Sequence, residues 1–163
     1  MVLATQKWLN KTYGSVANYK QVPETGNTGW PTIYGLIRGM QHELGITLQN
    51  GLPAFGEATS AAFDAKVVPN LKKGYKSNFV YLIQGAFWAK GVNPTEFTGI
   101  YSSYTDSAIK TLQVDAGVPA TGVLDSQLAQ ALFDMSAFVL VNDGDGKVRE
   151  MQQYLNANYR QYT

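Results

Sequence analysis

Hydrophobic and polar positions recur in the same order at three places along the chain. Each place has a valine, a glutamine four residues later, and a large apolar residue three further on. The three sets are Val2, Gln6 and Leu9; Val80, Gln84 and Phe87; and Val148, Gln152 and Leu155. Because spacings of four and three return to one helical face, each segment is predicted to be an amphipathic helix. The starts are about 70 residues apart, which predicts a repeated unit of that length.

A second helix is predicted in each of the first two units. Its apolar face consists of Ile33, Ile37, Met40 and Leu44 in the first unit, and of Ala108, Ile109, Leu112 and Ala116 in the second. Pro31 suits the first helical turn, where a missing N–H costs nothing. Thr105 is the expected N-cap of the second of these helices. Gly45 and Gly117 are expected just beyond the helix ends, with positive φ.

A third helix is predicted to close each unit. The first contains the segment FGEATSAAF with Phe63 facing inward, and the second is LDSQLAQALF, with Asp125 as N-cap and Leu128 and Leu132 inward. Residues 64–78 contain a proline and several lysines, and we interpret them as a linker. The predicted fold is therefore all-α, with two tandem three-helix modules at residues 1–70 and 76–141.

A third unit is predicted to begin at residues 142–163. The segment NDGDGK precedes its helix, and Asp145 is the expected N-cap. Only one helix of this unit is present, and a lone amphipathic helix cannot bury its apolar face. We expect either that this helix packs on the second module or that the natural chain continues beyond Thr163, and we favour the second.

The composition narrows the class of ligand. Charged residues make up 15% of the chain, against roughly 25% in typical soluble domains, so much of the surface must be neutral and polar. Such surfaces suit sugars or peptides better than polyanions. The formal net charge of +1 provides no electrostatic basis for binding nucleic acid. Lys72, Lys73 and Lys76 form the local basic cluster, which we interpret as part of the solvated linker.

The start of the chain and the lengths of its apolar runs indicate whether it carries a signal peptide or a membrane span. Met1 leads directly into a helical pattern, and no signal peptide with a basic start and an apolar stretch is visible. No apolar run approaches the length of a membrane span. A membrane is therefore not expected among the partners.

No catalytic arrangement is recognisable in the sequence. The chain has no cysteine and one histidine, His42, which we interpret as a surface residue of a helix, so neither a metal site nor a cofactor is expected. A glycosidase needs two facing carboxylates. The candidate carboxylates each fit a loop, a turn or a solvated helix face: Glu24, Glu43, Glu57, Glu96 and Asp106. We therefore predict that this chain is not an enzyme.

Exposed aromatic side chains near turns are the candidate ligand contacts, since sugar faces stack on aromatic rings. Trp30, Tyr34 and Arg38 follow one another at intervals of four on the second helix of the first unit. Their face differs from the apolar face, so we expect them outside. Tyr101 and Tyr104 are the candidate aromatics of the second unit, although packing is the favoured role for Tyr101.

The second unit resembles a known family. Its segment TGIYSSYTDSAIKTLQVDAGVPATGVLDSQLAQAL, residues 98–132, is similar to the three-helix peptidoglycan-binding domain of bacterial and phage wall hydrolases. The matching positions are Thr98-Gly99, Tyr101, Thr105, Ala108-Ile109, Leu112-Gln113, Gly117-Val118 and Thr121-Gly122. Thr98 and Thr121 replace the aspartates of the family pattern, and Ser102 replaces a glycine. The first unit keeps Phe55-Gly56 and Thr59 of the same pattern.

The whole chain also resembles the repeat region of Gram-positive proteins in which such domains precede a glycoside-hydrolase-like catalytic domain. This resemblance implies a tandem region that binds peptidoglycan outside the cell or in its wall, without a cofactor, and that anchors a C-terminal catalytic domain. Two weak sites on one chain raise the apparent affinity for a polymer. Two alternatives stay open: a small helical lytic hydrolase with its own carboxylate pair, and a structural spacer or protein-interaction module.

Overall fold

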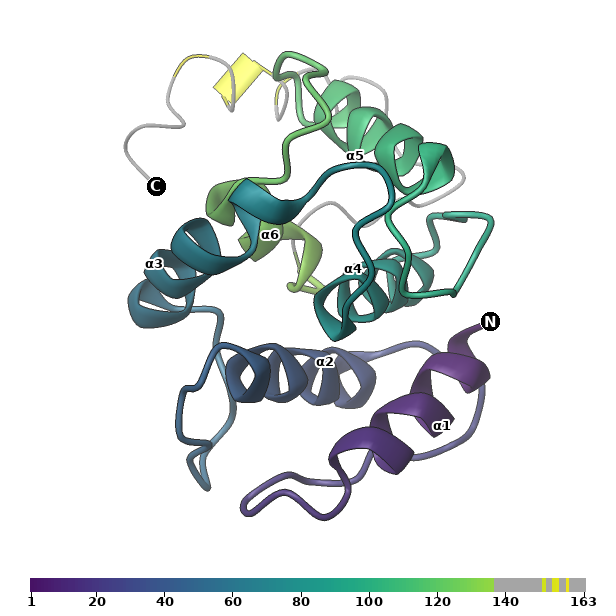
Figure 1. Cartoon of the computed structure of the whole chain (residues 1–163), viewed down its shortest axis with the longest axis vertical. Coiled ribbons are helices and arrows are strands. Elements are labelled where there is room, and N and C mark those ends of the chain that lie inside the picture. The colour runs from purple at the N-terminus through teal and green to yellow at the C-terminus, as the bar shows by residue number, and fades with distance from the viewer. Residues whose placement is uncertain (137–150, 152–153, 156–157, 159–163) are drawn as a thin grey trace.

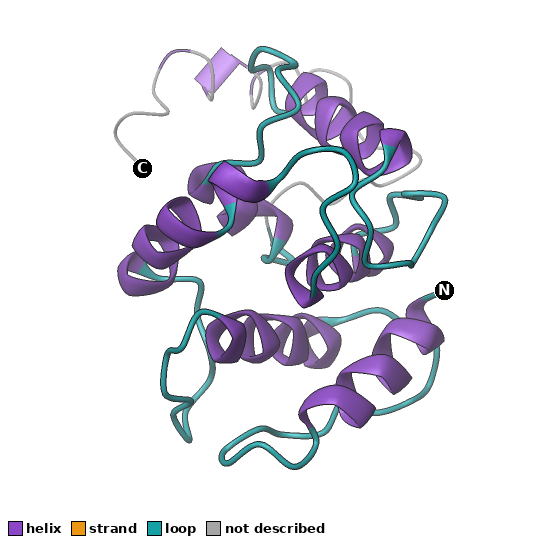
Figure 2. Cartoon of the chain, in the orientation of Figure 1, coloured by secondary structure: helices purple, strands orange, loops and turns teal. Residues whose placement is uncertain are grey.

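The computed structural model describes residues 1–136, 151, 154, 155 and 158. Apart from one isolated backbone bridge, all regular structure in this part of the chain is helical (Figure 2), which confirms the predicted all-α class. The elements are α1 (Val2–Tyr13), α2 (Trp30–Glu43), α3 (Glu57–Lys66), a short 3₁₀ helix η1 (Val68–Asn70), α4 (Asn78–Ala89), α5 (Ser103–Asp115) and α6 (Ser126–Leu132). The predicted start of the third unit, with Asp145, Val148 and Gln152, lies outside the described residues.

Local signals set several helix ends as predicted. The Asp125 side chain accepts a hydrogen bond from the backbone N–H of Leu128, 2.9 Å away, and so caps α6. Gly45 follows α2 with φ of 81°, and Gly117 follows α5 with φ of 72°. Only glycine adopts this left-handed geometry at little cost, and it allows the following residue to bond back to the helix. Both predicted C-terminal stops are confirmed.

The prediction that Thr105 caps α5 is wrong. The helix begins at Ser103, and the Ser102 hydroxyl accepts a hydrogen bond from the backbone N–H of Tyr104 at 3.0 Å. Thr105 is fully buried in the first turn. Its hydroxyl accepts a hydrogen bond from the Gln84 side chain at 3.0 Å. Thr105 therefore belongs to the buried polar network of this half, and Ser102 is the N-cap of α5.

A buried glutamine organises each half of the molecule. In the first half the Gln6 amide donates to the Thr32 hydroxyl at 3.0 Å and to the Asn27 carbonyl at 2.9 Å. Its oxygen accepts from the backbone N–H of Gly26 at 2.8 Å. A buried amide must satisfy its donors and acceptor, so Gln6 positions the loop between α1 and α2.

Gln84 makes the corresponding bonds in the second half. Its amide donates to the Thr105 hydroxyl at 3.0 Å and to the Ile100 carbonyl at 3.1 Å. Its oxygen accepts from the backbone N–H of Gly99 at 2.9 Å. Gly99 has a positive φ of 69°, close to the 75° of Gly26. The two halves thus hold the loop between their first and second helices with the same arrangement.

The two halves pack against each other around a shared hydrophobic core. In the view of Figure 1, α1 and α2 lie at the bottom and α5 at the top, with α4 and α6 between them. Helix α2 packs on α4, and α3 packs on α6. Two glycines allow the helices of the two halves to approach closely. A Cβ on Gly39 of α2 would lie 2.8 Å from the Leu82 side chain of α4, and a Cβ on Gly85 of α4 would lie 2.7 Å from the Thr5 side chain of α1.

The interpretation of residues 64–78 as a solvated linker is wrong in part. Helix α3 runs to Lys66, and Val67 is fully buried against the core. Further on, the backbone N–H of Tyr101 donates to the Tyr75 carbonyl at 2.8 Å, so this end of the segment is held against the second half. Asp64 accepts hydrogen bonds from the backbone N–H and the hydroxyl of Ser126. Because the halves share a core, the connection between them is drawn into it.

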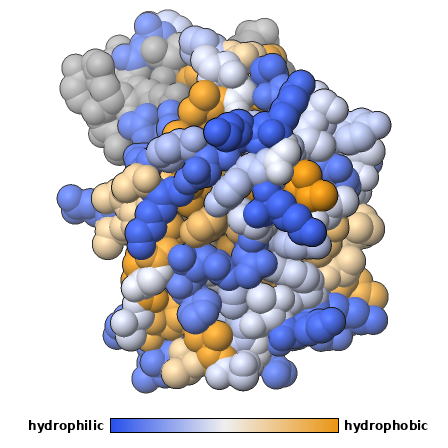
Figure 3. Space-filling model, in the orientation of Figure 1, coloured by the Kyte–Doolittle hydropathy of each residue, from blue (hydrophilic) through white to orange (hydrophobic). Residues whose placement is uncertain are grey.

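Polar and apolar residues are mixed on the surface of the molecule. On the face drawn in Figure 3, apolar residues come to the surface in separate patches between polar ones. None of the helices in the described part of the chain is both long and apolar enough to cross a membrane.

Candidate functional site

Two predicted ligand residues form an exposed aromatic pair at the start of α2. Trp30 is 41% exposed, and Tyr34 is half-buried one turn later. Their rings stack with centroids 5.3 Å apart and an angle of 27° between the planes. Pro31 lies in the first turn of the helix, where its fixed φ favours helix initiation. Each ring therefore covers one face of the other and holds it in place, and the exposed part of Trp30 is an apolar surface of the kind on which a sugar ring stacks.

The loop before this pair is anchored to the other half. The Thr28 hydroxyl donates a hydrogen bond to the carbonyl of Ala89 at the end of α4. Gly26, on the same loop, is held by Gln6. The start of α2 is thus fixed from both sides, so the aromatic pair is attached to a rigid support.

Arg38 does not lie outside as expected: it is only 4% exposed. Its Nη2 donates to the carbonyl of Gly51 at 2.9 Å, because the loop after α2 crosses the side chain. This burial lowers the pKa of Arg38, since a dry environment disfavours the charged form. Arg38 continues the line of Trp30 and Tyr34 on α2, but beneath a loop.

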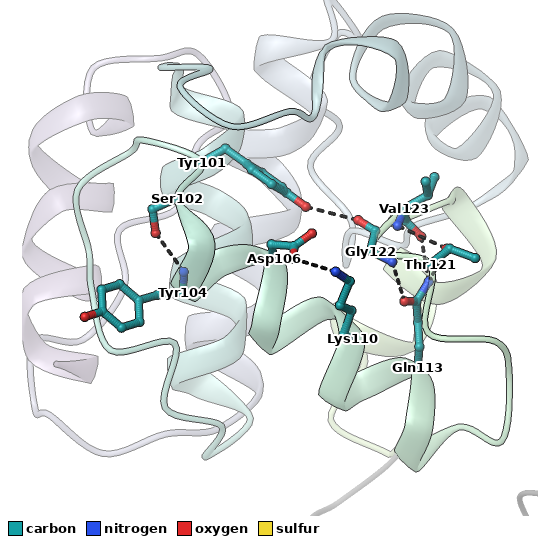
Figure 4. Close-up of polar contacts among 9 residues, drawn as sticks. All are labelled: Tyr101, Ser102, Tyr104, Asp106, Lys110, Gln113, Thr121, Gly122 and Val123. Atoms are coloured by element: carbon teal, nitrogen blue, oxygen red, sulfur yellow. Dashed lines mark hydrogen bonds and ion pairs between the residues drawn. The ribbon is translucent and has the colours of Figure 1, made fainter.

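Tyr101 is also buried, at 2% exposure. Its hydroxyl donates to the carbonyl of Gly122 at 3.0 Å (Figure 4), which ties the start of α5 to the turn before α6. Burial, and to a smaller extent the nearby Asp106 carboxylate, raises the pKa of Tyr101 to about 12. The phenol is a structural bridge, in agreement with the packing role favoured for it.

Tyr104 lies on the surface, with 55% of its side chain exposed. Figure 4 shows its ring pointing away from Tyr101 and from the turn around Gly122. The structure therefore does not bring Tyr101 and Tyr104 together into one site. Tyr104 remains an isolated exposed ring on the first turn of α5.

The two halves differ at the aromatic pair. Thr32 and Thr105 occupy matching places because each bonds to the buried glutamine of its half. Counting from them, the position of Trp30 corresponds to Ser103, and that of Tyr34 corresponds to Ser107. Tyr104 corresponds to Pro31. The second half consequently lacks the stacked pair of the first.

The turn before α6 is held by Gln113 (Figure 4). Its amide donates to the Thr121 hydroxyl at 3.0 Å and to the Val123 carbonyl at 2.9 Å, and its oxygen accepts from the backbone N–H of Gly122 at 2.8 Å. All the polar atoms of this amide are engaged within the chain. Gln113 therefore shapes the turn and leaves no amide group free for a ligand.

Four of the five carboxylates considered for catalysis have partners within the chain: Glu24, Glu43, Glu96 and Asp106. Glu43 accepts from the Tyr13 hydroxyl at 2.9 Å and from the Asn78 amide at 2.6 Å, and so joins α1 and α2 to α4. Glu96 accepts from the Thr105 hydroxyl at 3.1 Å. No group of three or more His, Asp or Glu residues in the described ranges could hold a metal ion.

One residue of the region was missed by sequence reasoning. Tyr19 lies in the loop between α1 and α2, where no periodic pattern marks a buried side chain. It is nevertheless only 9% exposed, and its hydroxyl has no hydrogen-bond partner among the residues that the structure describes. Its environment is created by contact with α2, which a local pattern does not reveal.

Comparison with known proteins supports the resemblance for the second half. Residues 76–132, which contain α4, α5 and α6, match the family model described as "Putative peptidoglycan binding domain". The chain is 44% identical over 165 residues to YbfG, an uncharacterized protein of Bacillus subtilis strain 168, covering 99% of this chain and 22% of that protein. It is 39% identical over 160 residues to the uncharacterized protein FadG of the same strain, covering 98% of this chain and 27% of that protein.

The chain spans about a quarter of the length of these two curated relatives. No solved structure matches it. The second half of the chain, at residues 76–132, is thus similar to the peptidoglycan-binding domain family.

Proposed function

We propose that this chain is a non-catalytic region that binds the peptidoglycan of the bacterial cell wall. The observation that carries the proposal is the match of residues 76–132 to the peptidoglycan-binding family, which covers the whole α4–α6 half. Domains of this type bind and do not catalyse. The satisfied structural roles of Glu43 and Glu96 agree with a chain that performs no hydrolysis itself.

The two halves are proposed to be tandem copies of one module, at residues 1–70 and 76–141. In support, Gln6 and Gln84 hold their loops through the same set of partners, and both loops contain a positive-φ glycine. The two copies are not structurally independent, because they share one hydrophobic core. A rigid pair presents its two outer surfaces at a fixed separation, which raises the effective concentration of the second contact.

The proposed glycan contact is the stacked pair of Trp30 and Tyr34. A sugar ring stacked on an aromatic face covers apolar C–H groups and leaves its hydroxyls free for polar neighbours. The exposed ring of Tyr104 is proposed as a second, weaker contact on the other half. Tyr101 is excluded from direct contact by its burial.

The wider context is proposed from the relatives and the resemblance. The two Bacillus relatives are much longer than this chain, so a natural protein of this type has room for a C-terminal catalytic domain. We propose that the module region anchors such a cell-wall hydrolase, or a related glycoside-hydrolase-like enzyme, at its substrate. The location would then be extracellular or in the wall.

The test is co-sedimentation of the chain with purified peptidoglycan from which teichoic acid has been removed. We expect the wild type to sediment, Trp30→Ala to sediment much less, and Trp30→Phe to retain most of the binding because it keeps a ring. Tyr104→Ala should have a smaller effect, and Val114→Ala, an exposed change elsewhere on α5, should have none. A folded wild-type chain that stays in solution would refute the proposal.

Two further measurements separate the alternatives. Clearing of a wall suspension by the wild type, abolished in Glu43→Gln or Glu57→Gln, would favour the lytic hydrolase. Absence of wall binding together with dimers in gel filtration would favour the spacer or interaction module. The binding proposal predicts neither clearing nor a need for dimers.

A further inference from the structure

Two buried polar atoms of the first half have no partner in the described part of the chain. They are the hydroxyl oxygen of Tyr19 and the Nε of Arg38. Both side chains are at least nine-tenths buried. Buried donors are nearly always satisfied, by protein or by a bound molecule, so an unsatisfied pair in one place needs an explanation.

The positive charge of Arg38 makes the lack of a partner for its buried Nε more unusual. Within the described ranges no carboxylate lies within ion-pair distance of its guanidinium. The carbonyl of Gly51 accepts one hydrogen bond from Nη2, and this neutral acceptor does not balance a buried charge. Buried charges in proteins are usually paired or bound to a ligand.

The two orphan groups lie over the same stretch of α2. A Cβ built on Gly35 would be 3.1 Å from the Tyr19 hydroxyl, so this hydroxyl rests on the helix one turn before Arg38. The Asn18 amide, on the Tyr19 loop, donates to the Leu48 carbonyl at 2.9 Å. The loops before and after α2 are thereby tied together on the side where Tyr19 and Arg38 lie.

We propose that Arg38 and Tyr19 form a binding site for a carboxylate. A guanidinium presents Nε–H and one Nη–H as a parallel fork that matches the two oxygens of a carboxylate, and a tyrosine hydroxyl adds a third donor. A carboxylate would satisfy both orphan donors and supply the missing negative charge. It would enter beside Gly51, whose exposed loop covers the guanidinium.

The position of the site suggests what carries the carboxylate. Tyr34 and Arg38 are neighbours on one helical face, because residues four apart lie side by side. A glycan stacked on Trp30 and Tyr34 would place a peptide branch near Arg38. The inference therefore rests on the proposed function: the site would take a free carboxylate of the peptide part of peptidoglycan.

The first experiment compares walls with and without free carboxylates. Purified peptidoglycan is treated with a carbodiimide and ammonia, which converts its carboxylates to neutral amides of similar shape. We expect the wild type to bind treated walls at least about tenfold more weakly than untreated walls, the loss expected for a charge-assisted contact. Tyr19→Phe should bind untreated walls more weakly and treated walls like the wild type.

Variants separate a ligand role from a structural one. Tyr19→Phe removes only the orphan hydroxyl, so it should keep the fold intact. Arg38→Lys keeps the charge but lacks the fork, and should lose the preference for untreated walls. Trp30→Ala should weaken binding to both kinds of wall. If the wild type binds both walls equally and Tyr19→Phe changes nothing, the orphan atoms hold only water and the inference is wrong.

A second measurement does not depend on walls. Sodium acetate is titrated into the labelled chain at constant ionic strength, with acetamide as the neutral control, and the Nε–H signal of Arg38 is followed by NMR. A shift with acetate that is reduced in Tyr19→Phe supports the site even if the chain fails to bind walls. The absence of any shift up to about 100 mM, a concentration that detects even weak contacts, overturns it.

Discussion

The indole of Trp8 on α1 stacks on the ring of Tyr81 on α4, with centroids 4.8 Å apart and an angle of 25° between the planes. The ring of Phe97 meets both from the side, at 5.9 Å from Trp8 and 5.1 Å from Tyr81. Stacked and edge-on pairs stabilise a protein beyond the area that they bury. This cluster therefore joins the two halves into one cooperative unit.

Trp8→Ala should destabilise the whole chain. Because Trp8 is half-buried, we expect a loss of about 2 kcal/mol, below the 3–5 kcal/mol usual for a fully buried large aromatic. Urea unfolding followed by far-UV circular dichroism should still give one transition, at lower urea, and Trp8→Phe should recover part of the loss. Two separate transitions, with one of them unchanged, would contradict a shared core.

Gly85→Ala should interfere with the packing of α1 and α2 on α4. The added Cβ would lie 2.7 Å from the Thr5 side chain and 3.1 Å from that of Leu36, and overpacking of this kind costs about 1–3 kcal/mol. Gly51→Ala is the matched control, since no atom in the described part of the chain would lie within 4 Å of its Cβ. Equal melting temperatures for the two variants would show that α1, α2 and α4 can shift to accommodate the added methyl group without a loss of stability.

Gln6→Met and Gln84→Met should have similar, large effects. Gln6→Met removes the acceptor of the Gly26 N–H and the donor to the buried Thr32 hydroxyl. Gln84→Met removes the acceptor of the buried Gly99 N–H and leaves the Thr105 hydroxyl with Glu96 alone. Each buried group left unpaired costs about 1–3 kcal/mol. We expect each variant to lose at least about 2 kcal/mol in urea unfolding. A large effect in one half only would argue against equivalent polar cores.

Stability should rise with pH from about 8 to about 9.5. Burial lowers the pKa of Lys90 from 10.5 to about 8, so the unfolded chain binds more protons than the folded chain in this window. Below pH 8 Lys90 is charged in both the folded and the unfolded chain, so its contribution to stability no longer changes with pH. Near pH 10 the effect is opposed, because burial raises the pKa of Tyr13 and Tyr19 and their unfolded forms lose protons first.

The check is the urea midpoint at pH 7.5 and at pH 9.5. The wild type should gain roughly 1–2 kcal/mol between them, given about 1.4 kcal/mol for each pKa unit. Lys90→Met should remove most of this gain, and Lys110→Met, a change in an exposed residue, should leave it intact. A wild-type midpoint that falls over this range would contradict the assignment.

Trp30→Ala should separate binding from stability. Because Trp30 is 41% exposed, its removal should change the free energy of unfolding by less than about 1 kcal/mol, while wall binding falls severalfold. Thermal melting and co-sedimentation of the same preparation provide both numbers. A large drop in melting temperature would mean that the indole is a packing residue.

The sequence by itself determined the helices, their inward faces and most of their ends. These depend on neighbours within one or two turns: the apolar face of α2, the cap at Asp125 and the glycine stops at Gly45 and Gly117 all follow from local spacing. The family resemblance of the second half was likewise readable, because its motif falls within one continuous stretch of chain.

Only the tertiary structure decided which polar and aromatic residues remain at the surface. Arg38 on α2 and Tyr101 just before α5 stand where a side chain could face water. A distant loop nevertheless covers Arg38, and the Gly122 carbonyl accepts a hydrogen bond from the Tyr101 hydroxyl. Thr105 was drawn from capping into the core by Gln84, twenty-one residues away. These outcomes depend on contacts between segments far apart in the chain, and periodicity records only the spacing within a segment.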